Sequence, residues 1–182
     1  MKTFIVVPEG LALDNEGRYF VSDHYAAALD LVLSIAEPAD RIYLAPANCF
    51  GAHQEEDYFG RDYLLAKQCQ SEIIQIDRGI QRKLYLDTLD NASYLKKHLK
   101  QRGNWPMGPV TLICNKPHKL RSWLMFRLCG FSIASTLTSV AVTRTGRTMV
   151  KRLWFYDLPY VQYFYEVAAI IYDSCRFIFL HE

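Results

Sequence analysis

The sequence predicts an α/β fold, a Rossmann-like three-layer sandwich with a mainly parallel central sheet of about five strands. Two observations lead to this prediction. Short apolar runs alternate along the chain with longer segments of helical periodicity. The apolar runs are also hydrophobic on both faces, as strands are when helices cover both sides of a parallel sheet. The 182 residues contain no internal repeat or linker, so we expect one domain spanning residues 1–182.

Four apolar runs are expected to form the first strands of this sheet. Each is short and ends at a polar or turn-forming residue, as strands commonly do. Beyond Gly130, the runs FSIAS and TSVAVT are further candidates for extended structure. The four main runs are Phe4–Val7, Arg41–Pro46, Glu72–Ile76 and VTLIC, which ends at Cys114.

Helical segments follow these runs. Asp23 is expected to cap the first helix, because a short acidic side chain can accept from the free N–H groups there. A second helix passes through Tyr58 and Leu64. A third opens near Thr88 and ends at Gly103, since glycine commonly terminates helices.

A fourth helix is expected directly after VTLIC and is closed by Gly130. Pro117 should lie in its first turn, where the missing N–H of proline costs nothing. Leucines spaced four apart should face the sheet. These are Leu120, Leu124 and Leu128. The later stretch TSVAVTRTGRTMVKRLWFYDLP does not fit the alternation, and it is either a hairpin turning at Thr145-Gly146 or a loop.

The C-terminal stretch from Tyr160 to Leu180 is long and aromatic, but charged residues interrupt it at helical spacing. This pattern predicts an amphipathic helix packed on the core rather than a membrane contact. The apolar row should then be buried and the polar row exposed. The apolar row includes Phe164, Ala168, Ile171 and Cys175, and the polar row includes Gln162 and Asp173.

Composition restricts the classes of partner. The net charge of +2 gives no global argument for nucleic acid, so none is expected. Five cysteines without paired short spacing favour a reducing cytoplasm over a disulfide scaffold or a zinc site. The first apolar run, FIVV, is too short for a signal peptide. We expect a cytoplasmic protein without a membrane span, and the oligomeric state stays open.

The candidate site lies where the strands end, because ligands of open parallel sheets bind beyond the carboxyl ends of the strands. His118 and Arg121 are three residues apart and share a helix face, where a guanidinium and helix N–H groups can hold a phosphate or carboxylate. A surface His and Arg beside an ordinary cap is the alternative. The residues expected to bind the ligand are Arg121, Asn91, Thr88, Glu9 and Asn115, and the family resemblance given below adds catalytic roles for His118 and Glu56.

Several of these residues also have a plain structural interpretation. Asp87 or Thr88 can simply cap the third helix, with Asn91 in its first turn. Glu56 suits the first turn of the second helix, where carboxylates favour the helix dipole. Its functional alternative is a general base or a metal ligand. No dinucleotide fingerprint, Walker A motif or metalloprotease motif occurs, and no metal is assigned.

Taken in order, these segments resemble the YdcF-like family, the group that includes SanA and ElyC. The resemblance runs from residue 4 to about 176 and depends on five segments. His118 and Arg121 match the family's V-T-S-x-x-H-x-x-R-A segment, and Glu56 matches the acidic residue after its second strand. The segments are VVPEGLALDNEGRYF with SDHYAAALDLV, DRIYLAPANCFGAHQEEDYFGRDYLLAK, DTLDNASYL, VTLICNKPHKLRSWLMFRLCGFSI, and YEVAAIIYDSCR with Glu166 and Ala169.

The resemblance implies a soluble member with a Rossmann-like domain and S-adenosylmethionine as a candidate cofactor. It leads to two hypotheses. The first is an enzyme that hydrolyses or transfers a group on a phosphate-bearing or nucleotide-like small molecule. The second is a non-catalytic binding or regulatory protein that keeps the pocket. The departures favour the second, because Pro8-Glu9-Gly10 and Ala45-Pro46-Ala47 stand where the family has glycine-rich turns.

Overall fold

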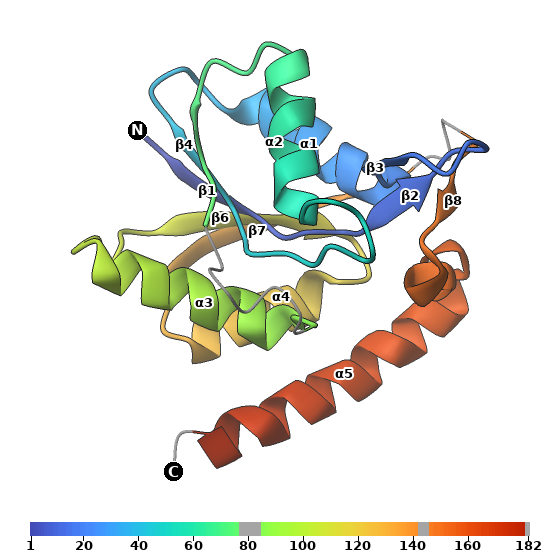
Figure 1. The fold of residues 1–182 in the computed structure, drawn as a ribbon. Coiled ribbons are helices and arrows are strands. Elements are labelled where there is room, and N and C mark those ends of the chain that lie inside the picture. Colours follow the sequence, from blue (N-terminus) through green and yellow to red (C-terminus); the bar gives the residue numbers. More distant parts are fainter. Residues whose placement is uncertain (77–84, 142–145, 181–182) are drawn as a thin grey trace.

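The predicted α/β architecture is confirmed by the computed structural model, which describes residues 1–76, 85–141 and 146–180 (Figure 1). Its central sheet has five strands in the order β5-β4-β1-β6-β7, and all four pairings are parallel. Each of the four main apolar runs contributes a strand. The later candidates FSIAS and TSVAVT contribute one strand, which takes only Thr138 and Ser139 from TSVAVT; Val140 and Ala141 are not in a strand, and Val142 and Thr143 lie outside the described residues. The strands are β1 (Thr3–Val6), β4 (Arg41–Leu44), β5 (Glu72–Ile74), β6 (Val110–Asn115) and β7 (Ile133–Ser139).

Helices cover both faces of this sheet, as Figure 1 shows. One core packs Phe4 and Val6 of β1 against two helices, and a second core packs Ile5 of the same strand against two others. Successive side chains of a strand point to opposite faces, so a run that is apolar at every position supplies both cores. The first pair is α1 (Asp23–Ile35) and α2 (Glu56–Ala66), and the second is α3 (Thr88–Gln101) and α4 (Lys119–Leu128).

A small antiparallel sheet, in the order β3-β2-β8, was not predicted. Its hairpin lies between β1 and α1, and the side chain of Asp14 accepts bonds from the backbone N–H groups of Glu16 and Arg18 in the turn. Strands of two or three residues are too short to carry a readable periodicity. They are β2 (Leu11–Leu13), β3 (Tyr19–Val21) and β8 (Thr148–Met149).

The stretch left open between hairpin and loop therefore contributes β8, which pairs with β2. Thr145, at the expected turn, lies outside the described residues. After β8, a short 3-10 segment, η2 (Lys151–Asp157), leads into the last helix, α5 (Pro159–Leu180). The small sheet and η2 share an apolar cluster that includes Leu11, Met149 and Leu153.

Two helix starts differ from their predictions. The cap of α1 is Ser22, whose hydroxyl accepts from the backbone N–H of Tyr25. Pro117 lies in a turn before α4, and His118 is the cap residue of that helix. The expected row of leucines is wrong for Leu120, which is 61% exposed. The buried residues of α4 are Arg121, Ser122, Met125 and Phe126.

The leucine prediction failed because the helix is rotated by one residue, about 100° around its axis. Leu124 and Leu128 are only partly buried at the edge of the core. The rotation places Arg121 inside the protein, next to α3 and α5. A charged side chain therefore occupies an interior position that the apolar pattern had given to leucine.

The burial prediction for α5 is wrong. Its apolar row is exposed, with Phe164 80% and Ile171 61% accessible, whereas Gln162 and Asp173 are buried. Ala168 and Cys175 are exposed as well. The helix is amphipathic as predicted, but its polar row faces α4 and the start of α3. No helix within residues 1–76, 85–141 and 146–180 is both long and apolar enough to cross a membrane.

Candidate functional site

The carboxyl ends of β1, β4 and β6 meet at one edge of the sheet, and the predicted site residues gather there. Five of them line one small cavity of about 30 Å³, which is close to the space of a single water molecule. The other two border it through direct contacts described below. The five are Glu56, Thr88, Asn91, His118 and Arg121, and the two are Glu9 and Asn115.

A chain of polar contacts crosses this site from β1 to α4. Oε1 of Glu9 lies 3.1 Å from Nδ1 of His118, and Nε2 of the same ring lies 2.8 Å from Oγ1 of Thr88. Nε of Arg121 donates to that hydroxyl oxygen over 2.7 Å. All four side chains are buried. A hydroxyl, an imidazole and a carboxylate thus lie in sequence, with a guanidinium beside the hydroxyl.

The direction of each hydrogen bond in this series of contacts can be assigned from Arg121, because its guanidinium can only donate. Since Oγ1 of Thr88 accepts from Nε of Arg121, its own hydrogen is free to point at Nε2 of His118. The neutral ring then carries its hydrogen on Nδ1 and donates to Glu9. Burial alone would lower the pKa of His118, but the carboxylates of Glu166 and Glu9 outweigh it and raise that pKa.

Glu9 is held by neighbours as well as by the histidine. Its Oε1 accepts from the backbone N–H of Asn115 over 2.6 Å, and its Oε2 accepts from the hydroxyl of Tyr156 over 3.3 Å. The amide of Asn115 lies 2.9 Å from Nδ1 of His24. Asn115 therefore positions Glu9 through its backbone while its side chain points to α1.

Glu56 connects the loops that follow β1 and β4. Its carboxyl accepts from the backbone N–H of Gly10 over 2.7 Å and from that of Asn48 over 3.1 Å. Burial raises the pKa of Glu56 to about 8, although the two backbone bonds oppose the shift. The group is therefore mostly protonated at neutral pH. The first-turn interpretation of Glu56 is confirmed, since it opens α2. Its carboxyl also lines the cavity, and its role as a general base or metal ligand stays a prediction.

Gly10 is required where it stands, for two reasons. Its φ of +93° is a left-handed conformation that favours glycine. A Cβ there would also lie 2.5 Å from Cδ1 of Leu153 in η2. The close approach that glycine permits at this turn is therefore to the protein's own η2, which covers the site.

The polar side chains at and around the start of α3 act mainly as braces. Asp87 caps the helix and forms a capping box with Asp90, which confirms the structural interpretation of this segment. Asn91, with its amide nitrogen as donor, reaches the carbonyls of Pro46 and Asp87. Asn48, which the sequence did not single out, donates to the carbonyl of Leu86 and accepts from its N–H.

Arg121 brings a buried positive charge to the site. Its side chain is 6% exposed, its Nη1 lies 3.4 Å from Oε2 of Glu166, and its Nε lies 3.5 Å from Oδ2 of Asp173. Among the described residues, neither Nη1 nor the two oxygens of Glu166 has a hydrogen-bond partner. The ion pairs are therefore close but poorly directed, and they leave donor capacity unused.

Two carboxylates of α5, Glu166 and Asp173, also lie at the candidate site. The sequence analysis expected the polar row of this helix to be exposed, but both side chains are buried. Burial, and then the nearby Asp87, raise the pKa of Asp173 to about 7. Arg176 of the same helix pairs with Asp87 and Asp90 at the start of α3. The sequence shows that Glu166, Asp173 and Arg176 form one polar row of the helix. It does not show whether that row faces the protein or the solvent.

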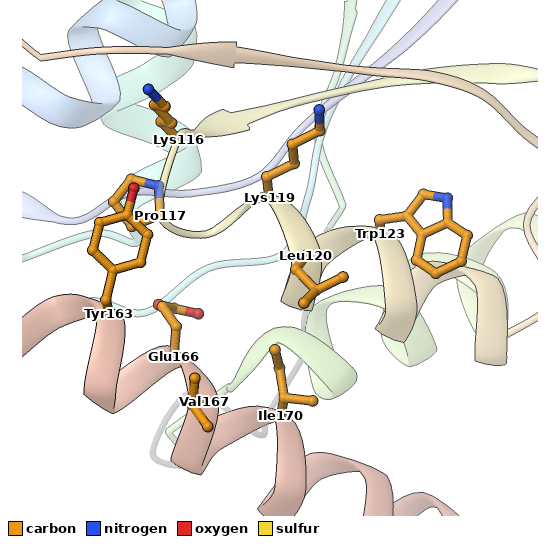
Figure 2. Close-up of a pocket in the computed structure, with 9 residues that line it drawn as sticks. All are labelled: Lys116, Pro117, Lys119, Leu120, Trp123, Tyr163, Glu166, Val167 and Ile170. Atoms are coloured by element: carbon orange, nitrogen blue, oxygen red, sulfur yellow. The ribbon is translucent and has the colours of Figure 1, made fainter.

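Two wider grooves flank α5. The groove against α4 has a volume of about 540 Å³ and is mostly apolar, and Figure 2 shows Leu120, Val167 and Ile170 along it. Glu166 rises in it from α5 toward the turn that contains Pro117. The groove on the other side, about 380 Å³, is lined by Tyr85, Asp87, Arg121, Tyr165, Ala168, Ala169, Tyr172, Asp173 and Arg176.

No group of three or more His, Cys, Asp or Glu side chains in the described part of the chain is arranged to hold a metal ion. Comparison of the chain with protein-family models, with curated proteins and with solved structures gave no match.

Proposed function

We propose that this chain is a cytoplasmic enzyme that hydrolyses, or transfers a group on, an anionic small molecule of the phosphate-bearing or nucleotide-like kind. The observation that carries the proposal is the contact chain from Glu9 through His118 to Thr88, with Arg121 beside the hydroxyl. The resemblance to the YdcF-like family belongs to the same proposal, and so does S-adenosylmethionine as a candidate cofactor.

The contact chain has the parts that acid–base chemistry needs. Glu9 holds the His118 ring by Nδ1, which leaves Nε2 to take a proton from the Thr88 hydroxyl or from a water in its place. The same nitrogen can later return the proton to a leaving group. Arg121 would stabilise negative charge that develops on the hydroxyl oxygen, because its Nε already donates there.

The anionic character of the ligand follows from Arg121. A buried guanidinium with an unused Nη1 donor favours a phosphate or carboxylate, which can accept two parallel bonds. The carboxylates of Glu166 and Asp173 already lie 3.4 and 3.5 Å from this guanidinium. A ligand anion would compete with these carboxylates for the guanidinium.

The groove of about 380 Å³ suits the rest of such a ligand. It reaches Arg121 and is bordered by tyrosine rings and by the second guanidinium, Arg176. Its size falls within the range of small-molecule sites, whereas the cavity of about 30 Å³ accommodates only the reacting group or a water. Tyrosine rings beside arginines favour a ligand with a flat ring and a phosphate.

The test is a turnover screen of phosphomonoesters and nucleotide conjugates, with thermal stabilisation measured for each compound. We expect His118→Ala to lower turnover by about 10²–10⁴-fold, the usual contribution of a general acid–base group. The control is His53→Ala, because His53 is exposed and lies outside the cavity lining. Circular dichroism confirms that both variants fold. Turnover that survives in His118→Ala overturns the proposed role.

The second candidate, a non-catalytic binding protein, is favoured by one observation. The cavity at the contact chain is nearly filled, and η2 approaches Gly10 closely. Under this alternative, compounds stabilise the fold without being turned over. The same screen separates the two candidates, since stabilisation and turnover are measured on the same compounds.

A further inference from the structure

The outer face of α5 is a larger apolar patch than a typical monomeric protein exposes. Ten large apolar or aromatic side chains of this helix are more than a third exposed. At about 200 Å² for a whole aromatic side chain, and somewhat less for an aliphatic one, they leave on the order of 1,000 Å² accessible. The largest apolar patch of a typical monomer is about 300–600 Å². The ten exposed side chains of α5 are Tyr160, Val161, Tyr163, Phe164, Tyr165, Val167, Ile171, Tyr172, Ile178 and Phe179.

The middle of this face has the spacing of a helix–helix seam. Exposed residues recur alternately three and four positions apart over nearly the whole of α5, which is the heptad spacing with which one helix packs along another. One set, Val161, Ala168 and Cys175, is small, and the other set, Phe164, Ile171 and Ile178, is large. We call these six residues the seam.

The order of small and large residues fits a second copy of the same helix running in the opposite direction. About a twofold axis between Ala168 and Ile171, each layer pairs a small residue with a large one. In this arrangement Phe164 would face Cys175 of the partner subunit, and Ala168 would face Ile171 of the partner subunit. Val161 would face Ile178 of the partner subunit. In a parallel pair the layers would instead stack small on small and large on large, which leaves gaps and crowding.

We propose that the protein forms a homodimer in which the two α5 helices pack antiparallel through the seam. About 800 Å² per partner is typical of a stable interface, and the exposed face of α5 provides that area. Such a contact is isologous, so one surface serves both subunits and the assembly closes at two. In each subunit, the polar row of α5 remains directed at that subunit's own α4. The α/β sheets of the two subunits therefore lie on opposite sides of the helix pair.

Charge favours a second copy over a lipid surface. The exposed side chains described on α5 are all uncharged, so two copies meet without repulsion. The one arginine of the helix, Arg176, is paired with Asp87 and Asp90. Helices that bind anionic lipid surfaces display lysines and arginines on their polar face. Here the polar face is buried and carries two carboxylates, Glu166 and Asp173.

The first test is the molar mass of the purified chain across a range of concentration, by sedimentation equilibrium. We expect a dimer at micromolar concentration and a dissociation constant about 100-fold weaker for Ile171→Asp, which places an unpaired charge at the centre of the seam. The control is Leu120→Asp, because Leu120 is also 61% exposed but lies on α4. We expect it to leave the dissociation constant unchanged.

A wild-type chain that stays monomeric at about 100 μM overturns the proposal. Binding of that monomer to anionic phospholipid vesicles, lost in Ile171→Asp, would assign the face to a lipid surface instead. Equal weakening by Leu120→Asp and Ile171→Asp would also overturn it, because the contact would then not be specific to the seam.

The second test fixes the direction of the helices by cross-linking. Phe164→Cys should form an intersubunit disulfide with Cys175 under mild oxidation, because the antiparallel register places the two in one layer. The wild type should not link through Cys175, since the two copies of this residue lie several layers apart. The double variant Phe164→Cys, Cys175→Ser is the control and should not link at this layer. A Cys175–Cys175 disulfide in the wild type would indicate a parallel pair and contradict the proposal.

Discussion

The sheet body and the helix α5 are held in place by opposite means. In the body, β1 buries Phe4 and Val6 on one face and Ile5 on the other, and apolar contacts with α1 to α4 hold the layers together. In α5, the buried row is Gln162, Glu166 and Asp173, and the apolar row faces outward.

The surface that a helix packs against decides which of its two faces turns inward. The sheet offers apolar surface, so its helices turn apolar rows inward. α4 offers the buried charge of Arg121, so α5 turns its carboxylates toward it. Burying a charge without a partner costs more than leaving apolar side chains exposed. The one inward-facing arginine of α4 therefore decides that the polar row of this 22-residue helix, and not its apolar row, turns inward.

The largest expected effect is that of Arg121→Ala. Removal of the guanidinium leaves Glu166 and Asp173 buried without a positive partner, so we expect a loss of about 3–5 kcal/mol in the free energy of unfolding. Because Arg121 is a brace as well as a candidate ligand binder, ligand affinity must be measured on folded protein. Urea unfolding provides the measurement, and Arg127→Ala, at an exposed position of the same helix, is the control. Equal losses in the two variants would mean that α5 is not held by this charge.

Apolar contacts should stabilise the sheet body, whereas the apolar row of α5 should contribute little. Truncating one apolar side chain in each region tests this difference. Leu29→Ala removes a fully buried side chain of α1 and should lower the free energy of unfolding by about 2–5 kcal/mol. Ile171→Ala removes a side chain that is 61% exposed and should change it by less than about 0.5 kcal/mol in dilute solution. A large loss for Ile171→Ala in the monomer would show that the apolar row of α5 faces the core.

Glu56 predicts a pH dependence. Its pKa rises from 4.5 to about 8 on folding, so the folded state keeps the proton longer, and stability is lost as pH rises through this window. Glu56→Gln cannot ionise. From pH 5 to pH 8, its stability relative to the wild type should therefore rise by about 2–4 kcal/mol.

Urea unfolding at the two pH values measures this change. Glu16→Gln removes an exposed carboxylate and should show little difference between them. A Glu56→Gln variant with the same pH profile as the wild type would mean that Glu56 is charged in the folded protein, in contradiction to its burial.

The smallest expected effect is that of Arg176→Ala. This arginine joins α5 to Asp87 and Asp90 from a partly exposed position, so solvent screens the contact. We expect a loss of about 1 kcal/mol that shrinks in high salt. Unfolding in low and high salt measures it. A loss that does not depend on salt would indicate a packing role for the side chain.

The fold and the location of the site could be predicted because both follow from continuous apolar runs. FIVV and VTLIC mark central strands, and the rule that parallel strands end at one edge brings His118 and Glu56 together. The three-residue strand β2 carries too little pattern to be found. Whether Glu9 braces His118 also could not be known, because that contact depends on the positions of two loops 109 residues apart.

The orientation of α5 could not be predicted for a different physical reason. Helical periodicity shows that two faces differ, but it does not show which face the rest of the protein attracts. That choice depends on Arg121, whose burial follows from a one-residue rotation of α4 after the turn at Pro117. A local detail at the start of α4 thus decides which face of α5, a helix that starts 40 residues later, turns inward.

Buried charges hold α5 against the sheet body, and a double-mutant cycle between Arg121 and Glu166 measures their contribution. The variants are Arg121→Met, Glu166→Gln and the pair, each compared with the wild type by urea unfolding in dilute solution. Because Nη1 of Arg121 and Oε2 of Glu166 lie 3.4 Å apart inside the protein, we predict a coupling of about 1–3 kcal/mol. Additive effects, with a coupling below about 0.5 kcal/mol, would show that this pair of charges does not hold α5 in place.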